Sequence, residues 1–107
     1  MITKQDAVSI LDDYLNRGRY GPYTGAEERV IDDELTLERD YGWLFTYNRA
    51  EYFRARDPHQ SLVGNGPILV RRDDGAVIRF FSSYGGEEAL AAYEGDPEKF
   101  PPADARS

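Results

Sequence analysis

Four aromatic residues take every second position in one short stretch of the chain: Tyr41, Trp43, Phe45 and Tyr47. A period of two, built from residues that favour β-structure, predicts a strand over residues 41–47 with its large rings on one face. Rings that each bury about 150–250 Å² would dominate the core of a small protein. We therefore expect this strand to be central, with Trp43 buried and structural.

Apolar residues recur at helical spacing near the start of the chain: Ala7, Val8, Ile10, Leu11, Tyr14 and Leu15. The pattern predicts an amphipathic helix over residues 3–17, with Asp12, Asp13 and Asn16 facing away from the core. Thr3 and Asp6 have the spacing of a capping box, which would fix the start of this helix.

A second helix is predicted near the end of the chain, with an apolar stripe made of Ala89, Leu90 and Tyr93. It would start at Ser82 or Gly86 and end at Gly95. Glu87 and Glu88 fall in its first turn, where the helix dipole favours acidic side chains.

The segment before the aromatic strand is predicted as a strand over residues 28–38, which the acidic run 32–34 could split as a bulge or a turn. A short link to the aromatic strand predicts antiparallel pairing. After the aromatic strand, Asn48 could cap a short helix that carries Tyr52 and Phe53.

A glycine-proline corner leads into an apolar strand over residues 68–72, and it consists of Gly64, Asn65, Gly66 and Pro67. We expect at least one of its two glycines to have a positive φ, and both to permit close backbone approach. A phosphate-binding loop is disfavoured, because a strand and not a helix follows.

Asp73-Asp74-Gly75 predicts a tight hairpin turn into a return strand over residues 76–81. We predict structural roles for Gly42, Trp43, Gly75 and the glycine-proline corner.

These elements predict an α+β fold, in which an antiparallel sheet of about four strands is covered by an N-terminal and a C-terminal helix. Residues 1–94 would form a single domain. Residues 95–107 would be a disordered or loosely packed tail, because they are polar and rich in proline.

The chain carries 20 acidic and 13 basic residues, for a formal net charge of −7. This balance disfavours nucleic acids and membrane surfaces, which bind mainly to Lys and Arg. It is compatible with a basic protein partner or with a merely solubilising acidic surface. The absence of cysteine and of a signal-peptide pattern suggests a cytoplasmic protein.

Two features of the sequence could provide catalytic or cation-binding groups. His59, the only histidine, lies near Asp57 and could act as a general base, although an exposed loop histidine is the alternative. Asp32 and Glu34 could serve glycoside hydrolysis or bind a cation if they shared one face of a strand. Because no further polar groups converge with either feature, the sequence predicts no catalytic residues, no metal and no cofactor, and favours a binding module.

Two neighbouring features could contact a partner protein: the acidic run Asp32, Asp33 and Glu34, and a loop with Tyr20 and Tyr23. The acids would steer the encounter with a basic partner and the rings would anchor it. The alternatives are an acidic solubilising edge and tyrosines that fold back onto the core.

The Gly42-Trp43 strand and the downstream run Leu62–Val70 resemble the immunity protein 35 family, also called the YrhB domain. The resemblance continues through Arg72–Gly75 to the last helix and covers most of residues 1–94. A Gly-Trp pair followed by Gly-Asn-Gly-Pro is fairly specific for the family.

This resemblance implies a small bacterial immunity protein that neutralises a toxin encoded next to it by stoichiometric binding, without enzymatic activity or cofactor. The acidic surface would suit a basic toxin such as a nuclease. One branch of the family has been regarded as heat-induced and chaperone-like, so a chaperone-like, stress-related binding protein is the alternative, followed by a small hydrolase. The identity of the toxin and the oligomeric state stay open.

Overall fold

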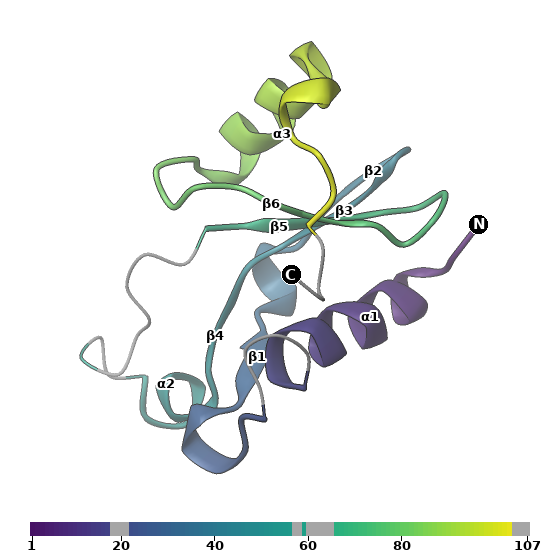
Figure 1. The fold of residues 1–107 in the computed structure, drawn as a ribbon. Helices are drawn as coiled ribbons and strands as arrows, with labels where there is room; N and C mark the ends of the chain where they lie inside the picture. Colours follow the sequence, from purple (N-terminus) through teal and green to yellow (C-terminus); the bar gives the residue numbers. More distant parts are fainter. Residues whose placement is uncertain (18–21, 57–58, 60–65, 104–107) are drawn as a thin grey trace.

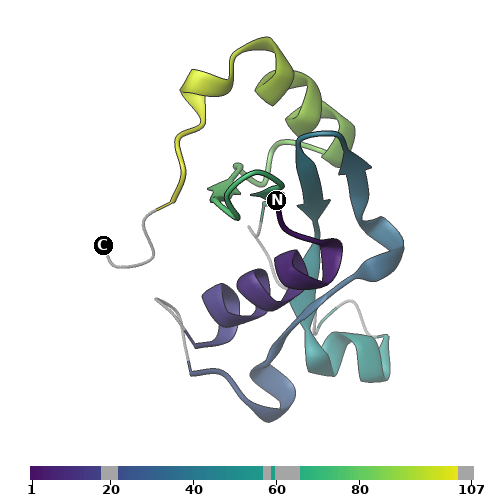
Figure 2. The same ribbon diagram turned by 90° about the vertical axis from the view of Figure 1, so that its right-hand side faces the viewer.

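A four-stranded antiparallel sheet with a helix on each side forms the centre of the molecule (Figure 1). The computed structural model describes residues 1–17, 22–56, 59 and 66–103. The sheet has the order β2-β3-β5-β6, with β2 at Leu37–Arg39, β3 at Gly42–Phe45, β5 at Ile68–Arg71 and β6 at Val77–Arg79. Helix α1, Lys4–Asn16, and helix α3, Gly86–Gly95, lie on opposite sides of it (Figure 2). The predicted α+β class with two covering helices is confirmed.

A second, two-stranded antiparallel sheet pairs β1, Arg29–Ile31, with β4, Tyr47–Arg49. The predicted aromatic strand is therefore two strands in two sheets, because the chain leaves the large sheet at Thr46, whose carbonyl oxygen accepts from the Asp32 amide at 2.7 Å. The predicted strand over 28–38 is also split, by a 3₁₀ turn at Asp33–Leu35 (η2).

Short helices complete the fold. In the part of the chain that the structure describes, 3₁₀ turns also lie at Gly25–Glu27 (η1) and Pro97–Lys99 (η4). Helix α2 spans Ala50–Ala55, and its N-cap is Arg49. The prediction that Asn48 caps this helix is wrong, because Asn48 lies within β4.

Both faces of β3 are covered, so all four of its residues are buried. The cluster on the α1 side contains Ala7, Leu11, Leu15, Trp43, Phe45, Tyr47, Ile68 and Val70. The cluster on the α3 side contains Leu44, Leu69, Ile78, Phe80, Ala89, Leu90 and Tyr93. Trp43 is 1% exposed, as predicted.

Tyr41 departs from the prediction that the four rings share one face. Its ring packs on the α3 side, 5.3 Å from the ring of Tyr93. Tyr41 precedes β3 in the turn from β2, so strand alternation does not govern its direction. Burial and a hydrogen bond to Glu94 raise the pKa of the Tyr41 phenol.

Two glycines stand where another backbone passes close by. A Cβ on Gly42 would lie 2.3 Å from the carbonyl oxygen of Val70, and one on Gly66 would lie 1.9 Å from that of Phe80. Close approach is thus the physical reason for glycine at both positions. Gly64 and Asn65 fall outside the described residues, so the expectation of a positive φ in this corner stays a prediction.

The capping box and the hairpin turn form as predicted. Thr3 Oγ1 accepts from the Asp6 amide at 3.1 Å, and Asp6 Oδ2 accepts from the Thr3 amide at 3.0 Å. Gly75 has a φ of +72° in the turn between β5 and β6. A hydrogen bond from Arg71 and another from the Ala76 amide lower the pKa of Asp74 to about 2.

We expect Asp74→Asn to change how the free energy of unfolding depends on pH between 7 and 2. The Asp74 carboxyl titrates near 3.9 when unfolded and at about 2 when folded. Its contribution is therefore present above pH ~4 and lost as the pH falls towards 2. Because this side chain is 50% exposed, the loss on substitution at pH 7 should stay below about 1 kcal/mol. Urea unfolding from pH 7 to 2 would measure it, with Asp73→Asn as the neighbouring control. Equal acid profiles for both variants would contradict this assignment.

The end of the chain packs more closely than its composition predicts. The Phe100 ring lies 4.9 Å from that of Phe80 and also contacts Tyr84 and Tyr93. The Ala103 amide donates to the Val77 carbonyl oxygen at 2.7 Å. Residues 96–103 therefore make specific contacts with β6 and α3, because one aromatic side chain in a polar segment suffices to anchor it.

Candidate partner-binding surface

The two features that the sequence proposes for partner binding lie at opposite ends of α1. Asp33 Oδ1 pairs with Lys4 Nζ at 3.2 Å, at the start of the helix. The Tyr23 amide donates to the Asn16 carbonyl oxygen at 2.9 Å, at its end. The helix has 13 residues, so its ends lie about 18 Å apart. Tyr20 falls outside the described residues.

Tyr23 is partly folded back onto the protein. The guanidinium carbon of Arg29 lies 4.0 Å from the centre of the Tyr23 ring, which is a cation–π contact. The tyrosine is half-buried in this arrangement. Its exposed part remains available at the end of α1.

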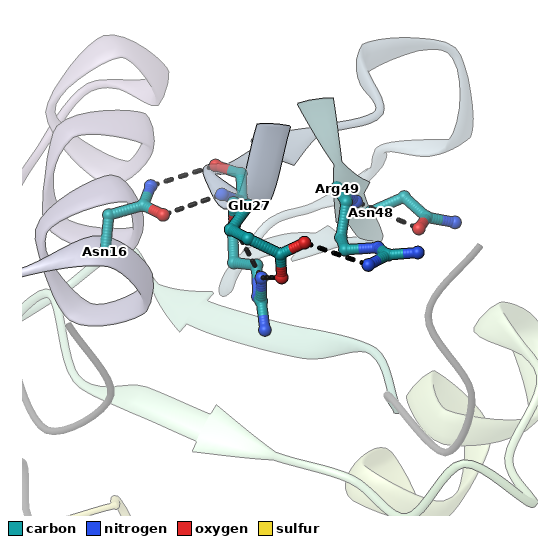
Figure 3. Close-up of polar contacts among 5 residues, drawn as sticks. Asn16, Glu27, Asn48 and Arg49 are labelled. Carbon is teal, nitrogen blue, oxygen red and sulfur yellow. Dashed lines mark hydrogen bonds and ion pairs between the residues drawn. The ribbon is translucent and has the colours of Figure 1, made fainter. Parts of the chain in front are cut away.

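Asn16 joins α1 to β1 (Figure 3). Its Oδ1 accepts from the Arg29 amide at 2.6 Å, and its Nδ2 donates to the Arg29 carbonyl oxygen at 2.9 Å and to Asp12 Oδ1 at 3.0 Å. A side-chain amide thus bonds β1 as a neighbouring strand would. Asn16 is only 4% exposed, so the prediction that it faces away from the core is wrong: β1 covers that side of the helix.

We expect Asn16→Asp to destabilise the protein by about 1–3 kcal/mol, because it removes both donated hydrogen bonds and places a second carboxylate beside Asp12. The loss should shrink at acidic pH, where the introduced carboxyl is protonated. Denaturant unfolding at pH 7 and pH 4 would measure both effects. An unchanged free energy of unfolding would show that the Asn16 bonds contribute nothing net.

Glu27 holds the two arginines of the small sheet (Figure 3). Its Oε1 lies 2.9 Å from Arg49 Nη1, and its Oε2 lies 3.7 Å from Arg29 Nη1. The amide of Arg49 also donates to Asn48 Oδ1 at 2.9 Å. The guanidinium of Arg29, between Glu27 and the Tyr23 ring, is therefore engaged within the protein.

A cleft runs between α1 and β1. A cavity of about 340 Å³ is lined by Val8, Ser9, Asp12, Glu28, Arg29, Val30 and Ile31. A smaller one of about 160 Å³ is lined by Asp12, Asn16, Arg17, Pro22, Tyr23, Thr24 and Glu28. Asp12 and Glu28 line both cavities, and we call this surface the α1–β1 cleft. Here the structure brings the side chains of two acids to a concave surface.

The cleft is lined by the carboxylates of Asp12 and Glu28. Neither Asp12 nor Glu28 pairs with a cation in the described part of the chain. Elsewhere acids pair with bases, as Asp13 with Arg17, Glu38 with Arg72, Glu51 with Arg54, Asp74 with Arg71 and Glu87 with Arg39. These two carboxylates therefore bring negative charge to the cleft, beside the guanidinium of Arg29, which Glu27 and the Tyr23 ring engage.

The other sequence candidates are not brought together. Asp32 and Glu34 flank the start of a 3₁₀ turn, so they do not share the face of a strand as the hydrolase interpretation needs. His59 is exposed. Over the described ranges, no group of three or more His, Cys, Asp or Glu side chains is arranged to hold a metal ion. Within those ranges, no helix combines the length and apolar character that crossing a membrane requires.

Sequence reasoning missed the cleft. Asp12 was expected on the exposed face of a helix, and Glu28 at the start of a strand, with nothing to indicate that they meet. An asparagine at the last position of an amphipathic helix was the one available signal, because a buried amide there needs partners from another segment.

The chain matches a family model and a known bacterial protein. The family model described as immunity protein 35 matches residues 5–96. The uncharacterized protein YrhB of Escherichia coli strain K12 is 28% identical over 96 residues, which are 88% of this chain and 90% of that protein. No solved structure gave a significant match.

Proposed function

Because the chain belongs to the immunity protein 35 family, we propose that it is a cytoplasmic immunity protein that neutralises a cognate toxin by binding it stoichiometrically. Binding would block the active site of the toxin or the path of its substrate. The observation that carries the proposal, beyond the family itself, is the α1–β1 cleft, whose carboxylates of Asp12 and Glu28 make no ion pair with the described residues.

The charge of the chain indicates the kind of toxin. A net charge of −7 and a concave acidic surface would attract a basic protein and repel acidic ones, which speeds association and limits wrong pairings. Toxins that act on nucleic acids need a basic surface to bind phosphates. We therefore propose a basic, nuclease-like toxin, encoded next to this chain, as the partner.

Asp32, Asp33, Glu34 and Tyr23 remain proposed contacts at the two ends of α1, and Tyr20, outside the described residues, remains a proposed contact. The Asp33 side chain is 80% exposed, so Asp33→Lys should leave the fold intact. It should slow association with the toxin several-fold and weaken the salt dependence, as expected for a charge at the rim. Stopped-flow binding would measure this, with Glu98→Lys as a control on the far side of the molecule.

Co-expression tests the proposed function. The neighbouring toxin gene should arrest growth of a host cell, and co-expression of this chain should restore it. A toxin from an unrelated system should remain active in the presence of this chain. Continued arrest, with the chain expressed and folded, would contradict the proposal.

A chaperone-like role is the second candidate, and one surface favours it. Phe81 is 79% exposed beside a cavity of about 410 Å³ lined by Arg79, Phe80, Phe81, Lys99, Phe100 and Pro101. Exposed aromatic groups of this kind bind apolar segments of other proteins. If the chain is a chaperone, it should suppress aggregation of unrelated clients, and Phe81→Ser should abolish this. Leu35→Ser, at another exposed apolar residue, is the control.

A further inference from the structure

The pairing of β1 with β4 determines which backbone groups face the α1–β1 cleft. The Ala50 amide donates to the Glu28 carbonyl oxygen, and the Asp32 amide donates to that of Thr46. In an antiparallel pair, residues directed at the partner strand alternate with residues directed away from it. The amide and carbonyl groups of Arg29 and Ile31 therefore face away from β4.

Arg29 and Ile31 differ in the hydrogen bonds that these outward-facing backbone groups make. At Arg29, the side chain of Asn16 binds both the amide and the carbonyl group. At Ile31, neither group has a hydrogen-bond partner among the residues that the structure describes. Such an edge is a ready binding site for an incoming polar group.

The chemistry of Asp12 explains why the Ile31 carbonyl oxygen lacks a donor on α1. Asp12 stands one helical turn before Asn16, and Ile31 stands two residues after Arg29. Both steps are roughly 6–7 Å long, and Asp12 and Ile31 line the same cavity. A carboxylate can only accept hydrogen bonds, and it cannot bind the Ile31 carbonyl as the Asn16 amide binds that of Arg29.

The cavity of about 340 Å³ is lined by Ile31, Asp12 and Glu28. It therefore lies beside the part of β1 whose backbone groups have no partner in the described structure. Its lining includes two carboxylates, the Ser9 hydroxyl and Ile31, and its own cation, Arg29, is held by Glu27 and the Tyr23 ring. A planar guanidinium with five donors matches several acceptors converging on one cavity.

We propose that this cavity receives an arginine side chain of the toxin, which donates to the Ile31 carbonyl oxygen and to the carboxylates of Asp12 and Glu28. The inference rests on the proposed function, since it names a site on the proposed partner. It places the main anchor of the complex in the middle of the α1–β1 cleft, between the acidic turn and Tyr23.

Affinity measurements with the protein product of the neighbouring toxin gene test this inference. Asp12→Asn keeps an acceptor for Asn16, and Glu28→Gln changes an exposed residue, so both variants should fold. Each should weaken the complex about tenfold or more, as expected when a desolvated charge pair loses one partner. Glu98→Gln removes the same charge far from the cleft and should change the affinity less than about twofold.

A double-mutant cycle identifies the partner side chain. One arginine→alanine variant of the toxin should weaken the complex as much as Asp12→Asn does, and combining the two should weaken it little further. If both cleft variants bind the toxin as tightly as the unaltered chain, the inference is wrong and the proposed function stands. If the unaltered chain does not bind the toxin, both are wrong.

Discussion

Replacing Trp43 by alanine should lower the free energy of unfolding by about 3–5 kcal/mol. Trp43 is 1% exposed and packs in the cluster on the α1 side of the sheet. The Arg72 guanidinium lies 4.3 Å from its ring centre and is fixed there by the carbonyl oxygens of Arg39 and Asp40. The substitution would leave a large cavity and remove this cation–π contact.

Trp43→Phe is the matched control. The Trp43 Nε1 group is buried and has no hydrogen-bond partner in the described structure. Phenylalanine would lose ring volume but would also remove this unsatisfied donor, so it should cost clearly less than alanine. Denaturant unfolding and Tm would measure both variants. An unchanged Tm for Trp43→Ala would show that the aromatic residue is not part of the core.

Gly66→Ala should destabilise the protein by about 1–3 kcal/mol or more, as expected for overpacking. The added Cβ would lie 1.9 Å from the Phe80 carbonyl oxygen and 2.7 Å from the carbonyl carbon of Phe81. Both obstacles are backbone atoms, so the start of β5 would have to move away from the chain after β6.

Gly95→Ala is the control for this substitution. A Cβ on Gly95, the last residue of α3, would meet no atom within 4 Å. Alanine there should leave the stability unchanged or raise it by up to about 1 kcal/mol, because it restricts the unfolded chain. Equal unfolding free energies for the two alanine variants would show that Gly66 is not required for close approach.

Local patterns predicted the elements whose residues carry their own signals. The spacing from Ala7 to Leu15 predicted α1, the capping box fixed its start, and Asp74-Gly75 predicted the β5–β6 turn. Each signal depends on residues close together in sequence, so tertiary contacts did not need to be known.

The remaining features depend on contacts between distant segments. The division of the aromatic strand at Thr46 follows from its bond to Asp32, and the burial of Asn16 follows from the position of β1. The anchoring of Phe100 likewise needs Phe80 and Tyr93. No period or composition within any one of these segments predicts its partner.

The candidate surface also combines features with a local sequence signal and features that depend on contacts between distant segments. The sequence identified an acidic run and a tyrosine loop because they are compositionally distinct. The α1–β1 cleft between them unites Asp12 with Glu28, which are separated along the chain and individually ordinary. Its concave shape and the approach of its two carboxylates arise only when α1 packs beside β1.

Titration of the toxin with this protein tests the central claim most directly. The activity of the purified toxin, held at a concentration far above the Kd of the complex, would be measured as the protein is added. We predict a linear fall that reaches zero at one molecule of the protein per molecule of toxin. Full toxin activity at several-fold molar excess of the folded protein would contradict neutralisation, and complete loss at a small fraction of equivalence would contradict stoichiometric binding.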